Sequence, residues 1–87
     1  MTLETSRQAG PAAAEDVETI LITHTGAEPA AFDGGRDVPL EDLGIDSLAV
    51  LELQAQVTDR YGVEIPEEAL RMSVLQIVDL INAKAGS

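Results

Sequence analysis

The segment from residue 47 to residue 61 is the feature that most constrains the fold. It contains neither Pro nor Gly, and it lies between Asp46 and Gly62. Asp is a favoured N-cap, and Gly is favoured just after a helix C-terminus. The pattern therefore predicts a helix over 47–61. At about 3.6 residues per turn, one side of it is apolar and is expected to face the core; this side carries Val50, Leu53, Val57 and Tyr61.

The opposite side of this helix carries a second, smaller apolar stripe. Leu48, Leu51 and Ala55 form the stripe, and Glu52 and Asp59 border it. A helix with two apolar sides either lies between packing layers or offers a docking surface to a partner. A chain of 87 residues has a small core, so we expect a docking surface.

Two further segments have helical periodicity. The segment 11–25 begins at Pro11, which suits a first helical position, and ends at Gly26. Its predicted apolar face carries Ala13, Val17, Ile20, Leu21 and His24. The last helix is expected to begin with a capping box of Ser73 and Gln76 and to end at Gly86. Its apolar face carries Val74, Ile77, Val78 and Ile81.

The remaining segments complete an all-α bundle. A short helix is predicted at 67–71, after Pro66. Residues 27–45 lack a helical period and are expected to form a long ordered loop, with a short turn at "PLEDL" and with Phe32, Leu40 and Leu43 as anchors. Residues 1–10 are expected to be a loose leader. The sequence therefore predicts one domain over 11–87, a four-helix bundle of three main helices and one short helix.

Charge and residue usage exclude several classes of function. The formal net charge is −11, and between Asp37 and Glu68 nine acids accompany a single base. This charge disfavours nucleic acids and anionic membranes as partners and favours basic protein surfaces. The absence of Cys excludes disulfides and thiolate metal sites. No run approaches the roughly 20 apolar residues of a membrane span, and no secretory signal is apparent, so we expect a cytoplasmic protein.

Ser47 is the residue with the most unusual position. As a catalytic nucleophile it would need a nearby base, but the only histidine is His24, and no G-x-S-x-G motif surrounds the serine. Helix capping is already supplied by Asp46. The first helical position does offer unpaired N–H groups and the positive end of the helix dipole, which would tolerate a phosphate on the hydroxyl. The residues alone disfavour catalysis and leave an ordinary helix position or a modified serine open.

The stretch "EDLGIDSLAVLEL" resembles the phosphopantetheine attachment motif of acyl carrier proteins. The matching residues are Leu43-Gly44, Asp46-Ser47-Leu48 and Glu52-Leu53. Further segments, "FDG", "RYGVEIPEE" and "DLIN", resemble the carriers of bacterial type II aromatic polyketide synthases, and the resemblance covers about residues 13 to 84. Three differences stand out: Leu75 where such carriers can have Arg, Ile45 where many have an aromatic residue, and Thr58 where fatty-acid carriers often have an acid.

The resemblance implies a carrier with no catalytic activity of its own. The Met1 start and the length of 87 residues favour a free-standing monomer over a carrier excised from a larger synthase, and no metal site is expected. Ser47, flanked by Asp46 and Leu48, would receive 4′-phosphopantetheine from coenzyme A. Implied partners are a phosphopantetheinyl transferase, a ketosynthase with its chain-length factor, a malonyl acyltransferase, and a ketoreductase with other tailoring enzymes. The implied docking residues are Leu48, Leu51, Glu52, Ala55, Asp59, Glu67 and Glu68. The expected acyl-chain contacts are Leu70, Leu75, Val78 and Asn82, although Asn82 has an alternative interpretation as a solvated surface amide.

Other functions are compatible with parts of the sequence to different degrees. A carrier for fatty-acid or specialised starter-unit synthesis has the same motif. An EF-hand loop starting at Asp33 fails, since Val38 stands where the glycine belongs and Gly44 where the bidentate Glu belongs. An acidic interaction adaptor without a prosthetic group, or an acidic mimic of nucleic acid, also stays open.

Overall fold

The computed structural model describes residues 12–85, and within them the fold is all-helical. The predicted leader 1–10, Pro11 and Gly86 lie outside the described residues. Three α-helices are present: α1 (Ala14–Thr25), α2 (Ser47–Tyr61) and α3 (Val74–Ala85). Three 3-10 helices connect them: η2 (Pro29–Gly34), η3 (Leu40–Leu43) and η4 (Glu67–Arg71). The predicted all-α class and the three main helices are confirmed, while the predicted short fourth helix is a 3-10 helix.

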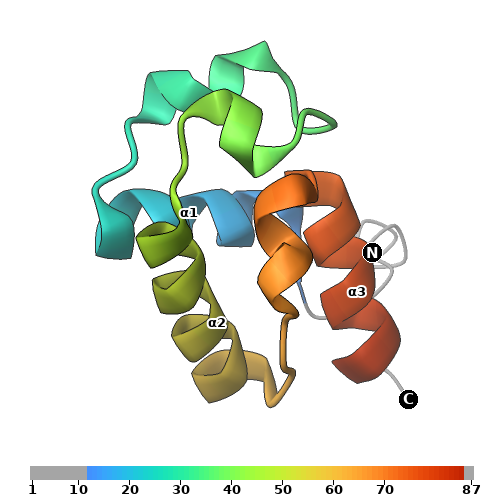
Figure 1. The fold of residues 1–87 in the computed structure, drawn as a ribbon. Coiled ribbons are helices and arrows are strands. Elements are labelled where there is room, and N and C mark those ends of the chain that lie inside the picture. Colours follow the sequence, from blue (N-terminus) through green and yellow to red (C-terminus); the bar gives the residue numbers. More distant parts are fainter. Residues whose placement is uncertain (1–11, 86–87) are drawn as a thin grey trace, which may run out of the picture.

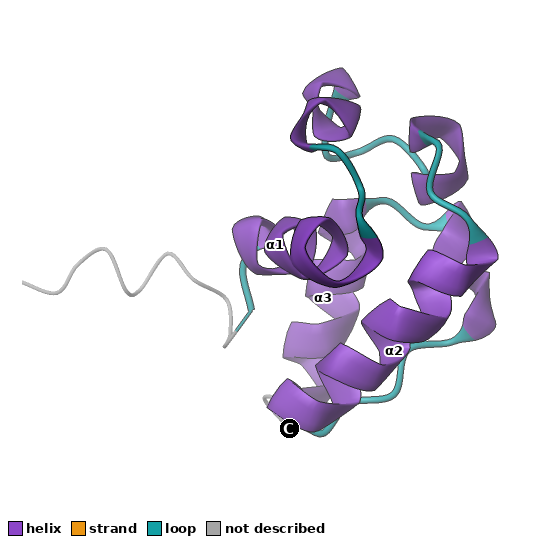
Figure 2. Ribbon diagram, turned by 90° about the vertical axis from the view of Figure 1, so that its left-hand side faces the viewer, coloured by secondary structure: helices purple, strands orange, loops and turns teal. Residues whose placement is uncertain are grey.

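The three α-helices are not parallel. Figure 1 shows α1 running across the upper ends of α2 and α3, with η2 and η3 above it and η4 between α2 and α3. Figure 2, turned by 90°, views α1 nearly along its axis and confirms the crossing. The core fills the space between them and consists of side chains from every α-helix, including Val17, Ile20, Leu21, Leu53, Val57, Val74, Ile77 and Ile81, all with no exposed surface.

α2 has the predicted bounds and the predicted caps. The Asp46 carboxylate accepts a hydrogen bond from the Ala49 N–H at 2.9 Å. Gly62 adopts the left-handed conformation, with φ of 69°, and its N–H donates to the Thr58 carbonyl. Val50, Leu53 and Val57 are buried as predicted, and Tyr61 is half-buried.

α1 begins later than predicted. Ala13 is extended (φ −122°, ψ 164°), so the helix starts at Ala14 rather than near Pro11. The Asp16 carboxylate accepts from the Ala13 N–H at 2.9 Å and thereby caps this end. The prediction that His24 lies on the buried face is also wrong, because its side chain is exposed.

The long connection between α1 and α2 is ordered by backbone contacts to the start of α3. The Leu40 N–H donates to the Met72 carbonyl at 3.0 Å, and the Leu75 N–H donates to the Arg36 carbonyl at 3.1 Å. The Arg36 side chain forms an ion pair with Glu18 of α1 at 2.9 Å, and this hydrogen bond and charge raise the pKa of Arg36. The predicted anchors contribute as expected: Leu40 is fully buried, and Phe32 and Leu43 pack against the core.

The predicted capping box of α3 is present. The Ser73 N–H donates to the Gln76 side chain at 2.9 Å, and the Gln76 N–H donates to the Ser73 hydroxyl at 3.2 Å. None of the helices in residues 12–85 is long and apolar enough to cross a membrane.

Candidate functional site

A short turn presents Ser47 at the surface. Gly44 ends η3 in the left-handed conformation, with φ of 86°, where a side chain would introduce strain. Ile45 then buries its side chain in the core, and Asp46 caps α2. Ser47 follows as the first residue of α2 and is exposed. The buried residue and the cap fix the backbone on one side of Ser47 and leave its hydroxyl accessible.

The electrostatics at Ser47 suit an attached anion better than catalysis. The amides of Ser47 and Leu48 are in the first turn of α2, where N–H groups have no carbonyl partner within the helix. Together with the helix dipole they favour negative charge at this end. His24 is exposed, and no hydrogen bond joins it to Ser47 in the described part of the chain. The site thus has an accessible hydroxyl without a general base paired to it.

Metal binding has no structural support in residues 12–85. No group of three or more His, Asp or Glu side chains in that range is arranged to hold a metal ion.

The second apolar stripe of α2 is exposed. The Leu48 and Leu51 side chains are 72% and 56% exposed, and Ala55 is also exposed. Glu52 is half-buried and accepts a hydrogen bond from Gln56 at 3.3 Å, whereas Asp59 is exposed. This side of α2 is therefore largely accessible to a partner, starting one residue after Ser47.

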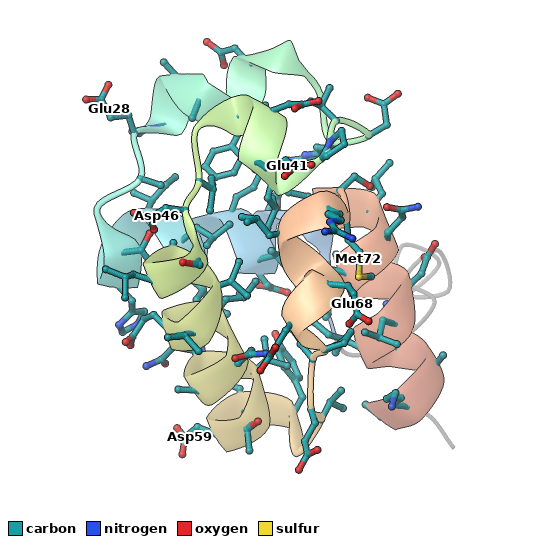
Figure 3. All side chains as sticks on the ribbon, in the orientation of Figure 1. Glu28, Glu41, Asp46, Asp59, Glu68 and Met72 are labelled. Carbon is teal, nitrogen blue, oxygen red and sulfur yellow. The ribbon has the colours of Figure 1, made fainter. Side chains whose placement is uncertain are left out.

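Exposed acids also occur on η4, which carries Glu67 and Glu68. Figure 3 shows Asp46 at one end of α2, Asp59 at the other, and Glu68 on the neighbouring η4.

The residues expected to contact an acyl chain lie in different environments. Leu70 is half-buried, Val78 is buried, and Leu75 is 45% exposed. Asn82 is buried, so its alternative interpretation as a solvated amide is wrong. Its side chain accepts from the Ala12 N–H at 2.9 Å and donates to the Ala12 carbonyl at 3.0 Å. This backbone pair occupies the amide oxygen and one of the two side-chain N–H groups, so an acyl-chain oxygen could bind only the second N–H unless it displaced the pair.

A groove that the sequence did not predict lies beside Asp46. It has a volume of about 490 Å³ and lies where the end of α1 and η2 meet the start of α2. Alanines form much of its wall, together with Leu43, Gly44 and Ile45 from the turn before Ser47. The only sequence signal for it is the cluster of small residues in 26–31, which has no helical period.

Comparison with known proteins identifies the family to which this chain is similar. The family described as "Phosphopantetheine attachment site" matches residues 15–83. An acyl carrier protein of Sinorhizobium fredii is 37% identical over 68 residues, which are 78% of this chain and 85% of the relative. A meromycolate extension acyl carrier protein of Mycobacterium tuberculosis is 40% identical over 54 residues, 62% of this chain and 46% of the relative. No solved structure matches the chain.

Proposed function

The chain belongs to the family of acyl carrier proteins with a phosphopantetheine attachment site, and on this premise we propose that Ser47 is the residue that carries the arm. Proteins of this family are carriers rather than enzymes, and their prosthetic group is covalent 4′-phosphopantetheine. The arm ends in a thiol that holds acyl groups as thioesters, so the absence of Cys from the chain is no obstacle.

The observation that carries this assignment is the exposed hydroxyl at the first position of α2. The hydroxyl is accessible to a transferase, and the first-turn amides can hold the phosphate that would be attached to it. Asp46 orders the turn by capping the helix, and Leu48 offers an exposed apolar contact to a partner. In this proposal the chain positions the arm, and partner enzymes perform the chemistry.

Because the chain has no cysteine, a thiol titration tests the assignment directly. The purified protein should contain no titratable thiol. After incubation with coenzyme A and a broad-specificity phosphopantetheinyl transferase, followed by removal of coenzyme A, it should contain one per chain, with a matching increase in intact mass. A chain that gains neither mass nor thiol would rule out the carrier function and leave an acidic adaptor as the interpretation.

We infer further that the cargo is a polyketide intermediate, on the resemblance of residues 13–84 to aromatic polyketide carriers. The alternative is a fatty-acid or specialised starter chain, and the name of the mycobacterial relative, meromycolate extension, favours a long acyl chain. Exposed Leu75, an apolar side chain at the start of α3, also favours a less polar cargo. An extension assay distinguishes the two cargoes. The malonyl-loaded protein is offered to a ketosynthase with its chain-length factor and, separately, to a fatty-acid ketosynthase, and the enzyme that extends the chain identifies the pathway.

We propose that partner enzymes dock on α2 and η4 through Leu48, Leu51, Glu52, Ala55, Asp59, Glu67 and Glu68. The acids would speed the encounter with basic enzyme surfaces, and the small apolar stripe would give a short-lived fit. A cytoplasmic monomer that engages a transferase, a malonyl acyltransferase and a ketoreductase in turn needs such weak binding.

Glu52→Lys is expected to reduce the rate of acyl transfer from a partner enzyme by about tenfold at low ionic strength, with the difference shrinking as salt is added. The helix should persist because Glu52 contributes only one side-chain hydrogen bond within α2. Asp79→Lys is the matched control, since Asp79 is an exposed acid on α3 rather than on α2 or η4. Equal rates for the two variants at low salt would contradict docking through α2.

A further inference from the structure

The groove beside Asp46 lies next to the proposed attachment point but plays no part in docking on α2. We propose that it holds the pantetheine portion of the arm on the carrier between transfers. This inference depends on the proposed function, because the arm must first be attached to Ser47. Asp46 and Ala49 line the groove, so residues on both sides of Ser47 in the sequence belong to its wall.

The shape of the groove suits a narrow, flexible chain. Ala27, Ala30 and Ala31 are among its lining residues, and no aromatic side chain lines it. A Cβ built on Gly26 or Gly44 would have no atom within 4 Å, which shows that the space around both backbone positions is open. Small side chains also leave backbone polar groups accessible, and the two amides of pantetheine can hydrogen-bond such groups.

Charge distinguishes the groove from another depression on the protein surface. That depression lies on η4, and three of its four lining residues, Glu67, Glu68 and Arg71, are charged. The groove has two carboxylates, Glu28 and Asp46, and Figure 3 shows Glu28 just before η2 and Asp46 at the start of α2, on the same side of the molecule. The Asp46 carboxylate is already used by the Ala49 N–H. The neutral amide segment of the arm therefore finds a less charged surface in the groove.

The groove also requires no rearrangement of the core. A chain entering between α2, η4 and α3 would have to separate side chains that are buried there, such as Val78 and Ala69. Exposing apolar side chains to make that space costs free energy before any contact with the chain is gained. The groove is open in the folded protein, so a resting arm can occupy it without that cost.

A spin label on the arm locates it, because the arm thiol is the only thiol in the loaded protein. After loading is confirmed by intact mass, the thiol is alkylated with a nitroxide, and paramagnetic broadening of backbone amides is measured by NMR. The proposal expects the strongest broadening at 26–31 and 43–45. Strongest broadening at Leu70 or Leu75, or weak broadening spread evenly over the chain, would overturn it.

Two variants provide a matched test. Ala30 is exposed and lines the groove, so Ala30→Tyr should fill it without disturbing the core and reduce the broadening at 43–45 by at least twofold. Ala83 is exposed on α3, and Ala83→Tyr should leave the broadening unchanged. If Ala30→Tyr retains the wild-type pattern, the groove does not hold the arm. A wild-type chain that cannot be loaded would instead overturn the proposed function.

Discussion

Ser47→Ala is expected to lose all phosphopantetheine loading and to keep its fold. The change removes the one oxygen to which the phosphate would be attached, and no neighbouring side chain can replace it as a nucleophile under transferase control. The Ser47 side chain is exposed and Asp46 already caps α2, so stability should change by no more than about 0.5 kcal/mol. Intact mass measures the loading, and thermal unfolding measures the fold.

Ser73→Ala is the matched control, with the opposite expected result. The Ser73 side chain is buried, and its hydroxyl accepts a hydrogen bond from the Gln76 N–H in the first turn of α3. Its loss should reduce the free energy of unfolding by about 1 kcal/mol, as for other N-caps, while loading stays at the wild-type level. Residual loading of Ser47→Ala, or loss of loading in a folded Ser73→Ala, would place the attachment elsewhere.

Local signals predicted most of the fold correctly. The bounds of α2 follow from Asp46 and Gly62, and the cap of α3 follows from Ser73 and Gln76, because each depends on residues within one turn of the helix end. The separation of α2 into a buried side and an exposed side was also predictable, since helical periodicity fixes which residues share a face.

The errors occurred where tertiary contacts decided the outcome. Ala12 and Ala13 have good helix propensity, but Ala12 pairs with Asn82, 70 residues away, and Ala13 is extended. No local pattern contains that contact. His24 fits the apolar face by period, but it lies in the last turn of α1, where its side chain is exposed. The groove depends on how η2 packs beside α2, and the sequence between 27 and 45 carries no periodic signal for it.

Only part of the Ser47 site could be predicted from the residues themselves. Its position at the start of a helix came from the residues, whereas the attachment of an arm came from the resemblance. Physical reasoning alone left an ordinary serine open, because an exposed hydroxyl at a helix N-terminus is chemically permissive rather than specific. The family match over residues 15–83 indicates that the chain carries a phosphopantetheine arm, and the assignment of the arm to Ser47 stays a proposal.

Asn82→Leu is expected to reduce the free energy of unfolding by about 2–4 kcal/mol, the largest stability loss among these variants. The two side chains are similar in size, so the main change is the loss of both hydrogen bonds to Ala12. Ala12 is 1% exposed, and its N–H and carbonyl would be left without partners away from water, at about 1–3 kcal/mol each before relaxation. The total free energy of unfolding of a small domain is about 5–15 kcal/mol. Chemical denaturation of the wild type and the variant measures the difference in this free energy.

Gln54→Leu is the control for Asn82→Leu, because it removes one side-chain hydrogen bond to the backbone instead of two. The Gln54 side chain donates one hydrogen bond, to the Ile65 carbonyl at 2.7 Å, and it is half-buried, so water can replace it in part. The expected loss is about 1 kcal/mol. Hydrogen exchange of the Ala12 amide should accelerate in Asn82→Leu and not in Gln54→Leu, because only the first variant releases that amide. Equal stabilities of the two variants, with the Ala12 amide still protected, would show that Asn82 does not hold the chain at the start of α1.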